Sequence, residues 1–237
     1  MNFDYLWEGG PVLAQSENFR YGTDSILLGN FIPVRGAKRA IDLGCASGVL
    51  SMLMLSRSDT ISVTGLEINE EAAALAKENM ARNGFSGRCE IVNGDIRSVR
   101  ELFRAGSFDV VVSNPPYFPV RSGGVSPKTG RAEARGEVAC TLEDLCAAAA
   151  YLCRWDGRFC LVHRPERLAE LFAAMTGHGI EPKRLRFVCH RADAAPSLVL
   201  TEGRRGGKPG VAVEPMLIIT DPDGQDTDEI KRIYHRI

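Results

Sequence analysis

Four stretches of the chain each place polar residues or glycines directly after a run of apolar residues. The loop "DLGCASG" (42–48) follows the first run, Glu67 ends the second, Asp95 follows the third, and "NPPY" (114–117) follows the fourth. Ligands bind at the carboxyl ends of the strands in open α/β sheets. We therefore expect these four stretches to share one crevice and one ligand.

The two acids indicate the chemistry of that ligand. Glu67 can accept hydrogen bonds from both hydroxyls of a ribose, and Asp95 can accept one from an adenine amino group. Ile68 and Ile96 would contact the two sides of the ring. The sequence thus suggests an adenosine ligand. Either acid could instead cap the helix that follows it.

The first loop is suited to a polar ligand at the entry to a helix. Gly44 stands where the chain must turn tightly, and Gly48 opens the next helix, whose free N–H groups favour polar or anionic groups. Ala46 and Val49 occupy the places where a G-x-G-x-x-G fingerprint needs glycine, so a nicotinamide dinucleotide site is disfavoured. A plain turn between strand and helix is the alternative.

The elements that must hold these residues alternate between strand and helix after residue 38. This pattern predicts a doubly wound, Rossmann-like α/β fold whose sheet is mostly parallel, with an antiparallel last strand. We expect strands at 39–44, 61–68, 88–95, 107–114, 158–163, 185–190 and 197–203, the last two pairing and closing the sheet. We expect helices at 25–31, 47–57, 69–84, 141–157 and 165–179.

Capping residues support two of these helices. Asn69 precedes one helix that stops at Asn83 and Gly84, and Thr141 with Asp144 forms a capping-box pattern for another. The length predicts one domain over 1–237, which comprises a covering segment (1–37), a core (38–204) and a C-terminal extension (205–237).

Composition narrows the class of protein. The 237 residues are 44% hydrophobic and 25% charged, enough for a full core, and the seven cysteines contain no CxxC pair, so we expect reduced thiols and no metal. The sequence starts without a signal-peptide pattern and holds no apolar stretch of membrane-spanning length, which predicts a cytoplasmic protein without a membrane partner. We expect a monomer.

Charge is nearly balanced, at −1. Any nucleic-acid binding must therefore come from local basic runs, of which 121–135, 183–191 and 203–208 are candidates. The alternative for each run is an ordinary mixed-charge surface.

The order "DLGCASG", "LEI", "NGDI", "NPPY" resembles the class I S-adenosylmethionine-dependent methyltransferases that act on exocyclic or amide nitrogens. "FRYGTDSILLG" (19–29) and "EIKRIY" (229–234) are similar to the bacterial tRNA(Val) adenine-N(6) methyltransferase family. The resemblance implies an enzyme that methylates the exocyclic amino nitrogen of an adenine in RNA, with tRNA favoured. Two positions depart from the pattern: Ala46 replaces a common glycine, a change that should be tolerated if φ is negative there, and "ARGE" (134–137) lacks a usual histidine.

The resemblance gives the "NPPY" motif a catalytic role. An aromatic amino nitrogen is a poor nucleophile because its lone pair is delocalised into the ring. The side-chain carbonyl of Asn114 and the backbone carbonyl of Pro115 can each accept an amino hydrogen and localise that lone pair. Pro116 keeps the turn rigid, and Tyr117 can stack on the base. Without these roles the motif would only end a strand.

The same resemblance implies the remaining contacts. S-adenosylmethionine would be bound by Thr23 or Arg20 at its methionine end, although Asp24 could equally cap the helix there. The cofactor residues are Thr23, Asp42, Gly44, Gly48, Glu67, Ile68, Asp95, Ile96 and Asn114, and the RNA contacts are Phe118, Lys128, Arg131 and Arg135.

Two rival functions remain at this stage. The first is a protein-glutamine N-methyltransferase, whose target amide nitrogen also has a delocalised lone pair. Such enzymes generally carry a helical domain before the first core strand, and only about forty residues precede Asp42 here. The chain could also be a non-catalytic RNA- or partner-binding module on this fold. The sequence does not choose between RNA, DNA and protein amide.

Overall fold

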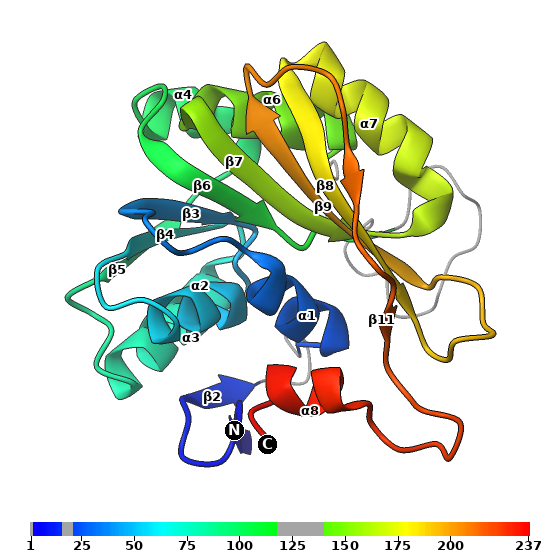
Figure 1. Cartoon of the computed structure of the whole chain (residues 1–237). Helices are drawn as coiled ribbons and strands as arrows, with labels where there is room; N and C mark the ends of the chain where they lie inside the picture. Colours follow the sequence, from blue (N-terminus) through cyan, green and yellow to red (C-terminus); the bar gives the residue numbers. More distant parts are fainter. Residues whose placement is uncertain (1, 16–20, 118–139) are drawn as a thin grey trace, which may run out of the picture.

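A nine-stranded sheet forms the centre of the molecule (Figure 1). The computed structural model describes residues 2–15, 21–117 and 140–237. The sheet runs in the order β10-β8-β9-β7-β6-β3-β4-β5, and β11 also pairs with β8. Its core strands are β3 (Arg39–Leu43), β4 (Ser62–Glu67), β5 (Cys89–Asn93), β6 (Phe108–Ser113), β7 (Cys153–His163), β8 (Ile180–Cys189) and β9 (Leu198–Arg205).

Strand directions agree with the predicted fold class. The pairs β3 with β4, β4 with β5, β3 with β6 and β6 with β7 are parallel. The last core strand along the chain, β9, is antiparallel to both of its neighbours, β7 and β8. Because the link between β8 and β9 is short, it can join only antiparallel neighbours. The doubly wound, mostly parallel fold with an antiparallel last strand is confirmed.

Helices cover both faces of the sheet. One face packs against α1 (Thr23–Phe31), α2 (Val49–Ser56) and α3 (Glu70–Arg82), and the other against α4 (Val99–Leu102), α6 (Leu142–Leu152) and α7 (Leu168–Gly177) (Figure 1). Side chains alternate between these two cores along β6: Val110 and Val112 enter the first, Val111 the second. Burial on both faces explains the continuous apolar runs of the sequence.

The predicted helix caps are present. The Asn69 side chain accepts a hydrogen bond from the Ala72 N–H at 3.0 Å. Thr141 and Asp144 form the reciprocal capping box. Gly84 ends α3 with φ at +72°, in the left-handed region that favours glycine.

The predicted helix over 141–157 is too long. It ends at Leu152, and residues from Cys153 onward belong to β7. Asp156 has φ at +66°, and the pairing of β7 with β6 shifts register between Phe108 and Val110. A Cβ at Gly157 would lie 3.0 Å from the Asp109 carbonyl oxygen. A bulge that needs glycine at this close approach therefore replaces the last helical turn.

The C-terminal segment extends the sheet, so the expectation that strands 185–190 and 197–203 close it is wrong. Two short strands, β10 (Ala212–Val213) and β11 (Leu217–Ile218), pair in parallel with β8. The edge of β8 still offered free backbone groups, and Leu217 is buried when it pairs there. The chain then continues into α8 (Asp228–Ile233), beside α1.

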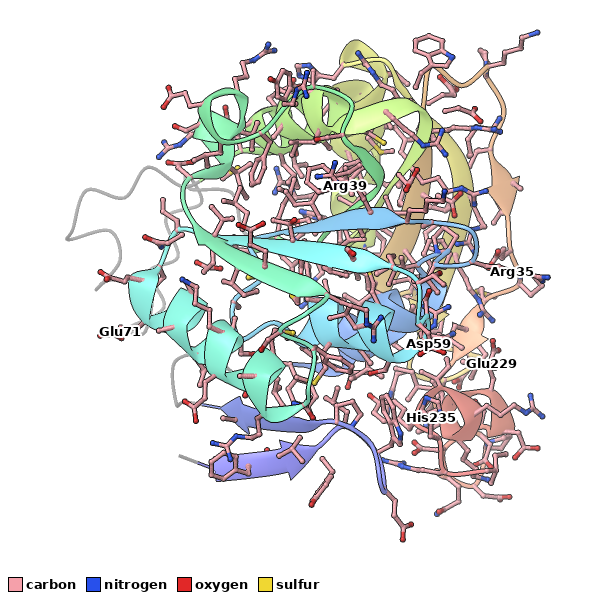
Figure 2. The ribbon with its side chains drawn as sticks, turned by 90° about the vertical axis from the view of Figure 1, so that its left-hand side faces the viewer. Arg35, Arg39, Asp59, Glu71, Glu229 and His235 are labelled. Atoms are coloured by element: carbon pink, nitrogen blue, oxygen red, sulfur yellow. The ribbon has the colours of Figure 1, made fainter. Side chains whose placement is uncertain are left out.

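The N-terminal residues form a hairpin of β1 (Asn2–Tyr5) and β2 (Val12–Gln15), which lies below α3 (Figure 2). The hairpin also meets the C-terminal segment, because the Trp7 ring stacks on His235 at 4.3 Å between centroids. Within the described residues, no helix is long and apolar enough to cross a membrane.

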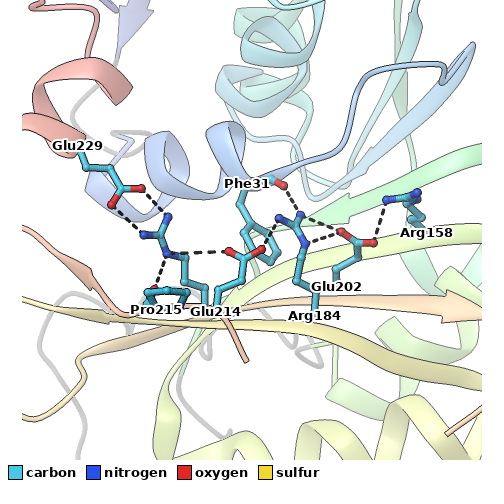
Figure 3. A network of polar contacts seen from close by, with 8 residues as sticks. Phe31, Arg158, Arg184, Glu202, Glu214, Pro215 and Glu229 are labelled. Atoms are coloured by element: carbon cyan, nitrogen blue, oxygen red, sulfur yellow. Dashed lines mark hydrogen bonds and ion pairs between the residues drawn. The ribbon is translucent and has the colours of Figure 1, made fainter. Parts of the chain in front are cut away.

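Ion pairs take up much of the basic run 183–191 (Figure 3). The Arg184 guanidinium lies 2.8 Å from a Glu202 oxygen, and Arg186 donates to both Glu229 oxygens at 2.7 and 2.8 Å. Arg184 also donates to the Phe31 carbonyl of α1 at 2.6 Å. In the run 203–208, Arg204 pairs with Asp156. Arg184 and Arg186 hold α1 and the C-terminal segment to the sheet, and Arg204 connects β9 with β7. These pairs agree with the mixed-charge alternative for the two runs.

Asn79 of α3 and Asn83, the C-cap residue of this helix, hold the hairpin in place. The Asn79 side chain accepts from the Ala14 N–H at 2.8 Å and donates to the Ala14 carbonyl at 3.1 Å. It also donates to the Ser47 carbonyl at 2.9 Å. Asn83 makes the matching pair of bonds with Val12. One buried side chain thus connects the N-terminal hairpin to the loop after β3.

We predict that Asn79→Ala lowers the free energy of unfolding by about 2–4 kcal/mol, because it leaves three buried backbone groups without partners. Urea denaturation measures this change. Lys77→Ala on the exposed side of the same helix is the control and should change stability by less than about 0.5 kcal/mol. Equal effects of the two substitutions would contradict the bridging role of Asn79.

Candidate active site at the carboxyl edge of the sheet

The side chain of Asn114 is held from two sides at the end of β6. Its Nδ2 donates to the Ser25 hydroxyl of α1 at 3.0 Å, and its Oδ1 lies 3.0 Å from the Tyr117 hydroxyl, a possible donor. These contacts fix the plane of the amide. Ser25 is buried and comes from a helix 89 positions away along the chain.

Tyr117 has two acceptors for one hydroxyl hydrogen. Besides Asn114, its hydroxyl donates to Oδ2 of Asp24. Burial, followed by the neighbouring Asp24 carboxylate, raises the pKa of Tyr117, so the phenol stays protonated. A charged carboxylate is the stronger acceptor. The Asn114 Oδ1 therefore keeps capacity to accept hydrogen bonds from another donor.

The Tyr117 ring lies between two residues that follow one another along the chain. It stands nearly edge-on to the His163 ring, with centroids 5.5 Å apart and planes at 67°, and the Arg164 guanidinium lies 5.3 Å from its centroid. Pro115 is partly buried and Pro116 is exposed. The ring is thus placed at the border between the core and the surface.

Asp24 does not cap α1, contrary to the alternative that the sequence left open. Gly22 is the N-cap residue, and Asp24 lies inside the first turn, where its Oδ1 accepts from the Ser25 N–H at 2.8 Å. Thr23 is the first residue of the helix and is exposed. Ser25 is not among the predicted site residues, although a serine at the start of an apolar helix signals a polar partner.

The loop after β3 folds back on the end of β4. The N–H groups of Gly44 and Cys45 both donate to the Leu66 carbonyl, at 2.8 and 3.1 Å. Gly44 has φ at +74° and Gly48 at +87°, so the tight turn expected at Gly44 is present. Ala46 has φ at +46°, so the condition of a negative φ, under which alanine is readily tolerated, is not met. Its left-handed conformation directs its N–H to the Glu67 carboxylate, at 2.8 Å.

Both Glu67 oxygens already accept a backbone hydrogen bond. Oε2 accepts from Ala46 and Oε1 from the Asn69 N–H at 2.9 Å. Each carboxylate oxygen has a second lone pair, so Glu67 can still accept from two hydroxyls. The carboxylate is therefore fixed in position before any ligand binds.

Asp95 caps the short helix that follows it, as the alternative interpretation foresaw. Its Oδ1 accepts from the Arg97 N–H at 2.8 Å, and the Arg97 guanidinium bonds both oxygens. Those hydrogen bonds lower the pKa of Asp95. Ile96 begins this helix and is partly buried, whereas Ile68 is 57% exposed. The Asn93 amide donates to the Ile68 carbonyl at 3.1 Å and holds the two loops together.

Asp42 lies beneath the loop and is completely buried. Its Oδ2 accepts from the Ser51 N–H at 3.1 Å and the Ser51 hydroxyl at 2.9 Å, while Oδ1 has no partner among the described residues. Burial, with a smaller contribution from Glu67, raises the pKa of Asp42 to about 7. A carboxyl group in this position readily exchanges its proton near neutral pH.

Strand register brings the first and fourth loops together. Asp42 pairs with Val112, so Gly44 and Asn114 follow side by side at the same edge of the sheet. The Ser113 hydroxyl donates to the Leu43 carbonyl at 2.8 Å. Arg20 and the predicted RNA contacts Phe118, Lys128, Arg131 and Arg135 lie outside the described residues. No group of three or more potential metal-binding side chains is found in the described part of the chain.

Comparisons with known proteins identify relatives of this chain. The model of the methyltransferase small domain family matches residues 18–127. A tRNA1(Val) (adenine(37)-N6)-methyltransferase of Tolumonas auensis is 32% identical over 89% of this chain and 86% of its own length. One from Cronobacter sakazakii is 32% identical over 86% of this chain and 82% of its own length.

Solved structures share the fold. A predicted O-methyltransferase of Agrobacterium tumefaciens superposes with a TM-score of 0.73 at 22% identity, covering 90% of this chain and 96% of its own. TrmN from Thermus thermophilus gives 0.56 at 19% identity, over 76% of this chain and 48% of its own. At these identities the likeness supports the fold alone.

We predict that Ala46→Gly raises the free energy of unfolding by about 0.5–1 kcal/mol, because relief of the left-handed strain exceeds the added chain entropy of glycine. Gly48→Ala should act in the opposite direction, since its new Cβ would lie 2.8 Å from Met80 Cε at φ of +87°. Thermal and urea unfolding of both variants test this. A destabilised Ala46→Gly variant would contradict the strain argument.

Proposed function

This chain belongs to the tRNA1(Val) (adenine(37)-N6)-methyltransferase family, and we propose that it transfers a methyl group from S-adenosylmethionine to N6 of an adenine in tRNA. One observation carries the proposal beyond family membership. The Asn114 amide is fixed beside the glycine loop, with unused acceptor capacity on Oδ1. An amino nitrogen placed there meets the acceptor that its activation requires.

The loops at the carboxyl edge fit the implied cofactor. Glu67 retains two free lone pairs for the ribose hydroxyls, and the exposed Ile68 side chain offers an apolar surface for the adenine ring. Asp42 and Glu67 provide negative charge near the glycine loop, which suits a ligand with a sulfonium and an ammonium group. S-adenosylmethionine supplies an electrophilic methyl group. We assign its binding to Thr23, Asp42, Gly44, Gly48, Glu67, Ile68, Asp95, Ile96 and Asn114.

Asp95 can serve the cofactor only through lone pairs that Arg97 leaves free. Its carboxylate is already a helix cap and an ion-pair partner. We propose that it accepts a hydrogen bond from the adenine amino group while Arg97 stays in place. This pairing keeps Asp95 ionised, because the lowered pKa disfavours its neutral form.

Asn114 and Pro115 activate the target nitrogen in this proposal. The two carbonyl oxygens accept the two amino hydrogens, which draws the nitrogen toward a tetrahedral geometry and localises its lone pair. Ser25 holds the Asn114 amide in the orientation that this requires. The positively charged product nitrogen then loses its extra proton to solvent.

Tyr117 has to give up one contact when the base binds. Its hydroxyl stands beside the same Asn114 oxygen that the amino group would use. We propose that the ring stacks on the base while the hydroxyl keeps its bond to Asp24. The assignments of Phe118, Lys128, Arg131 and Arg135 to RNA phosphates and bases, and the single-domain organisation, remain proposals from the sequence.

We predict that Asn114→Ala lowers the single-turnover rate of methyl transfer to tRNA by about 10²–10³, because one preorganised contact to the reacting group is lost. Transfer of labelled methyl from S-adenosylmethionine, with both substrates saturating, measures the rate. Cofactor affinity by calorimetry should fall far less than the rate, because Asn114 is only one of the nine residues assigned to the cofactor. Tyr117→Phe is the matched control: it keeps the ring and should retain most of the activity. Full activity of the Asn114→Ala variant would contradict the mechanism.

We predict that cofactor affinity depends on pH through Asp42. Asp42 has a pKa of about 7, above its ordinary value of 3.8, so it is protonated below pH 7. A cationic ligand favours the ionised form, and binding below pH 7 must release the proton. Cofactor affinity should therefore fall as pH falls from 7.5 to 5.5, by at most about tenfold per pH unit. Asp42→Asn should remove this dependence.

The stability of the free protein tests the same pKa independently. Between about pH 4 and 7 the folded state binds the Asp42 proton and the unfolded state does not, so this group makes stability fall as pH rises through that window. In the Asp42→Asn variant, the urea midpoint should lack the fall with rising pH that the Asp42 proton causes in wild type. An unchanged pH profile in both measurements would show that Asp42 does not titrate in this range.

A further inference from the structure

His163 ends β7 directly beside the proposed catalytic motif. Leu161 pairs with Ser113 in the parallel register of β6 and β7, so His163 is level with Pro115, two residues further along each strand. Its ring lies 5.5 Å from the Tyr117 ring. The mechanism proposed above gives this residue no task.

The protonation state of His163 follows from one hydrogen bond. Its Nδ1 accepts from the Arg164 N–H at 2.8 Å, so in the neutral ring the hydrogen resides on Nε2. Burial, followed by the charge of Arg167, lowers the pKa of His163 and keeps the ring neutral. Nε2 is therefore a hydrogen-bond donor.

That donor has no acceptor in the described part of the chain, although His163 is only 1% exposed. A buried donor without a partner costs about 1–3 kcal/mol. Native structures seldom keep such a group unless it has a task, and a ligand that supplies the acceptor removes the cost.

We propose that the Nε2–H of His163 donates a hydrogen bond to a ring nitrogen next to the amino group of the target adenine and thereby selects this base. The inference rests on the proposed function and names a specificity residue of the same site. Adenine has an acceptor nitrogen on either side of its amino group, N1 and N7. Guanine has a protonated N1 and a carbonyl at the position of the amino group, so a donor facing N1 rejects guanine. N7 is an acceptor in both purines, so a donor facing N7 would orient adenine while Asn114 alone excludes guanine.

The position of Tyr117 supports this assignment. A base that stacks on the Tyr117 ring comes close to the imidazole, since the two ring centroids are 5.5 Å apart. The same base must place its amino group at Asn114, three residues before Tyr117. Asn114, Tyr117 and His163 would then contact the amino group, the face and the edge of one base.

A structural explanation competes with this one. The Thr201 hydroxyl on β9 is also buried without a partner among the described residues. His163 pairs with Val199, two positions from Thr201, so both orphan groups lie on the same face of neighbouring strands. A buried water bridging them would satisfy both without any role in recognition.

Base analogues separate the two explanations. We would place adenosine, 1-deazaadenosine or 7-deazaadenosine at the methylated position of a tRNA that the wild-type protein methylates. Wild type should lose about tenfold or more in kcat/KM with one of the two analogues, because a buried donor is left unpaired. His163→Phe, which keeps the ring volume without the donor, should lose a similar factor with adenosine and show no further loss with that analogue. His163→Gln, whose amide nitrogen can reach the place of Nε2, should recover part of the selectivity.

The analogue penalty is the ratio of kcat/KM with adenosine to kcat/KM with the analogue. When this penalty is compared between wild type and a variant, the effect of the analogue on the intrinsic reactivity of the amino group cancels. An equal penalty in wild type and His163→Phe, or no penalty in wild type with either analogue, overturns the inference and favours the bridging water. If His163→Phe fails to fold, wild type is compared with His163→Gln instead. A His163→Gln variant that has the wild-type analogue penalty but a lower free energy of unfolding would show that His163 has a structural role. Failure of the proposed function would appear differently, as no methylation of unmodified tRNA by wild type.

Discussion

The parallel register of β3 with β4 and β6 is the constraint on which the site depends. It aligns the ends of these strands, so that the glycine loop, Glu67 and Asn114 emerge at one edge. A slip of one residue would turn the alternating side chains of β6 to the wrong cores and move Asn114 away from the loop. The burial of Val110, Val111 and Val112 on two different faces makes such a slip costly.

Segments far from this edge in the sequence hold it in shape. Helix α1 supplies Ser25 and Asp24, which orient Asn114 and Tyr117. The helix is fixed in turn by Arg184 of β8, whose guanidinium bonds the Phe31 carbonyl and lies 3.7 Å from the centre of the Phe31 ring. Helix α8 near the C-terminus also contacts α1, and His235 just after it stacks on Trp7 of the N-terminal segment.

Groups that break the usual rules of burial are concentrated around the same edge. Among the described residues, Asp42 is a buried carboxyl with one unpaired oxygen and His163 is a buried donor without an acceptor, and Ala46 has a left-handed backbone. Each lowers the stability of the free protein, and each is adjacent to a residue assigned to cofactor or base. The arrangement is that of a site whose polar groups are positioned before the ligand arrives.

The sequence by itself determined the fold class, the caps of the helices and the four loops that meet, because apolar periodicity, capping residues and glycines act over a few neighbouring positions. It misjudged the end of the helix at Leu152, since the bulge at Asp156 and Gly157 depends on pairing with a distant strand. Only the tertiary structure revealed Ser25 beside Asn114, the sign of φ at Ala46, and the pairing of the basic runs with Glu202 and Glu229. These features arise from contacts between residues far apart along the chain, whose partners no local pattern specifies.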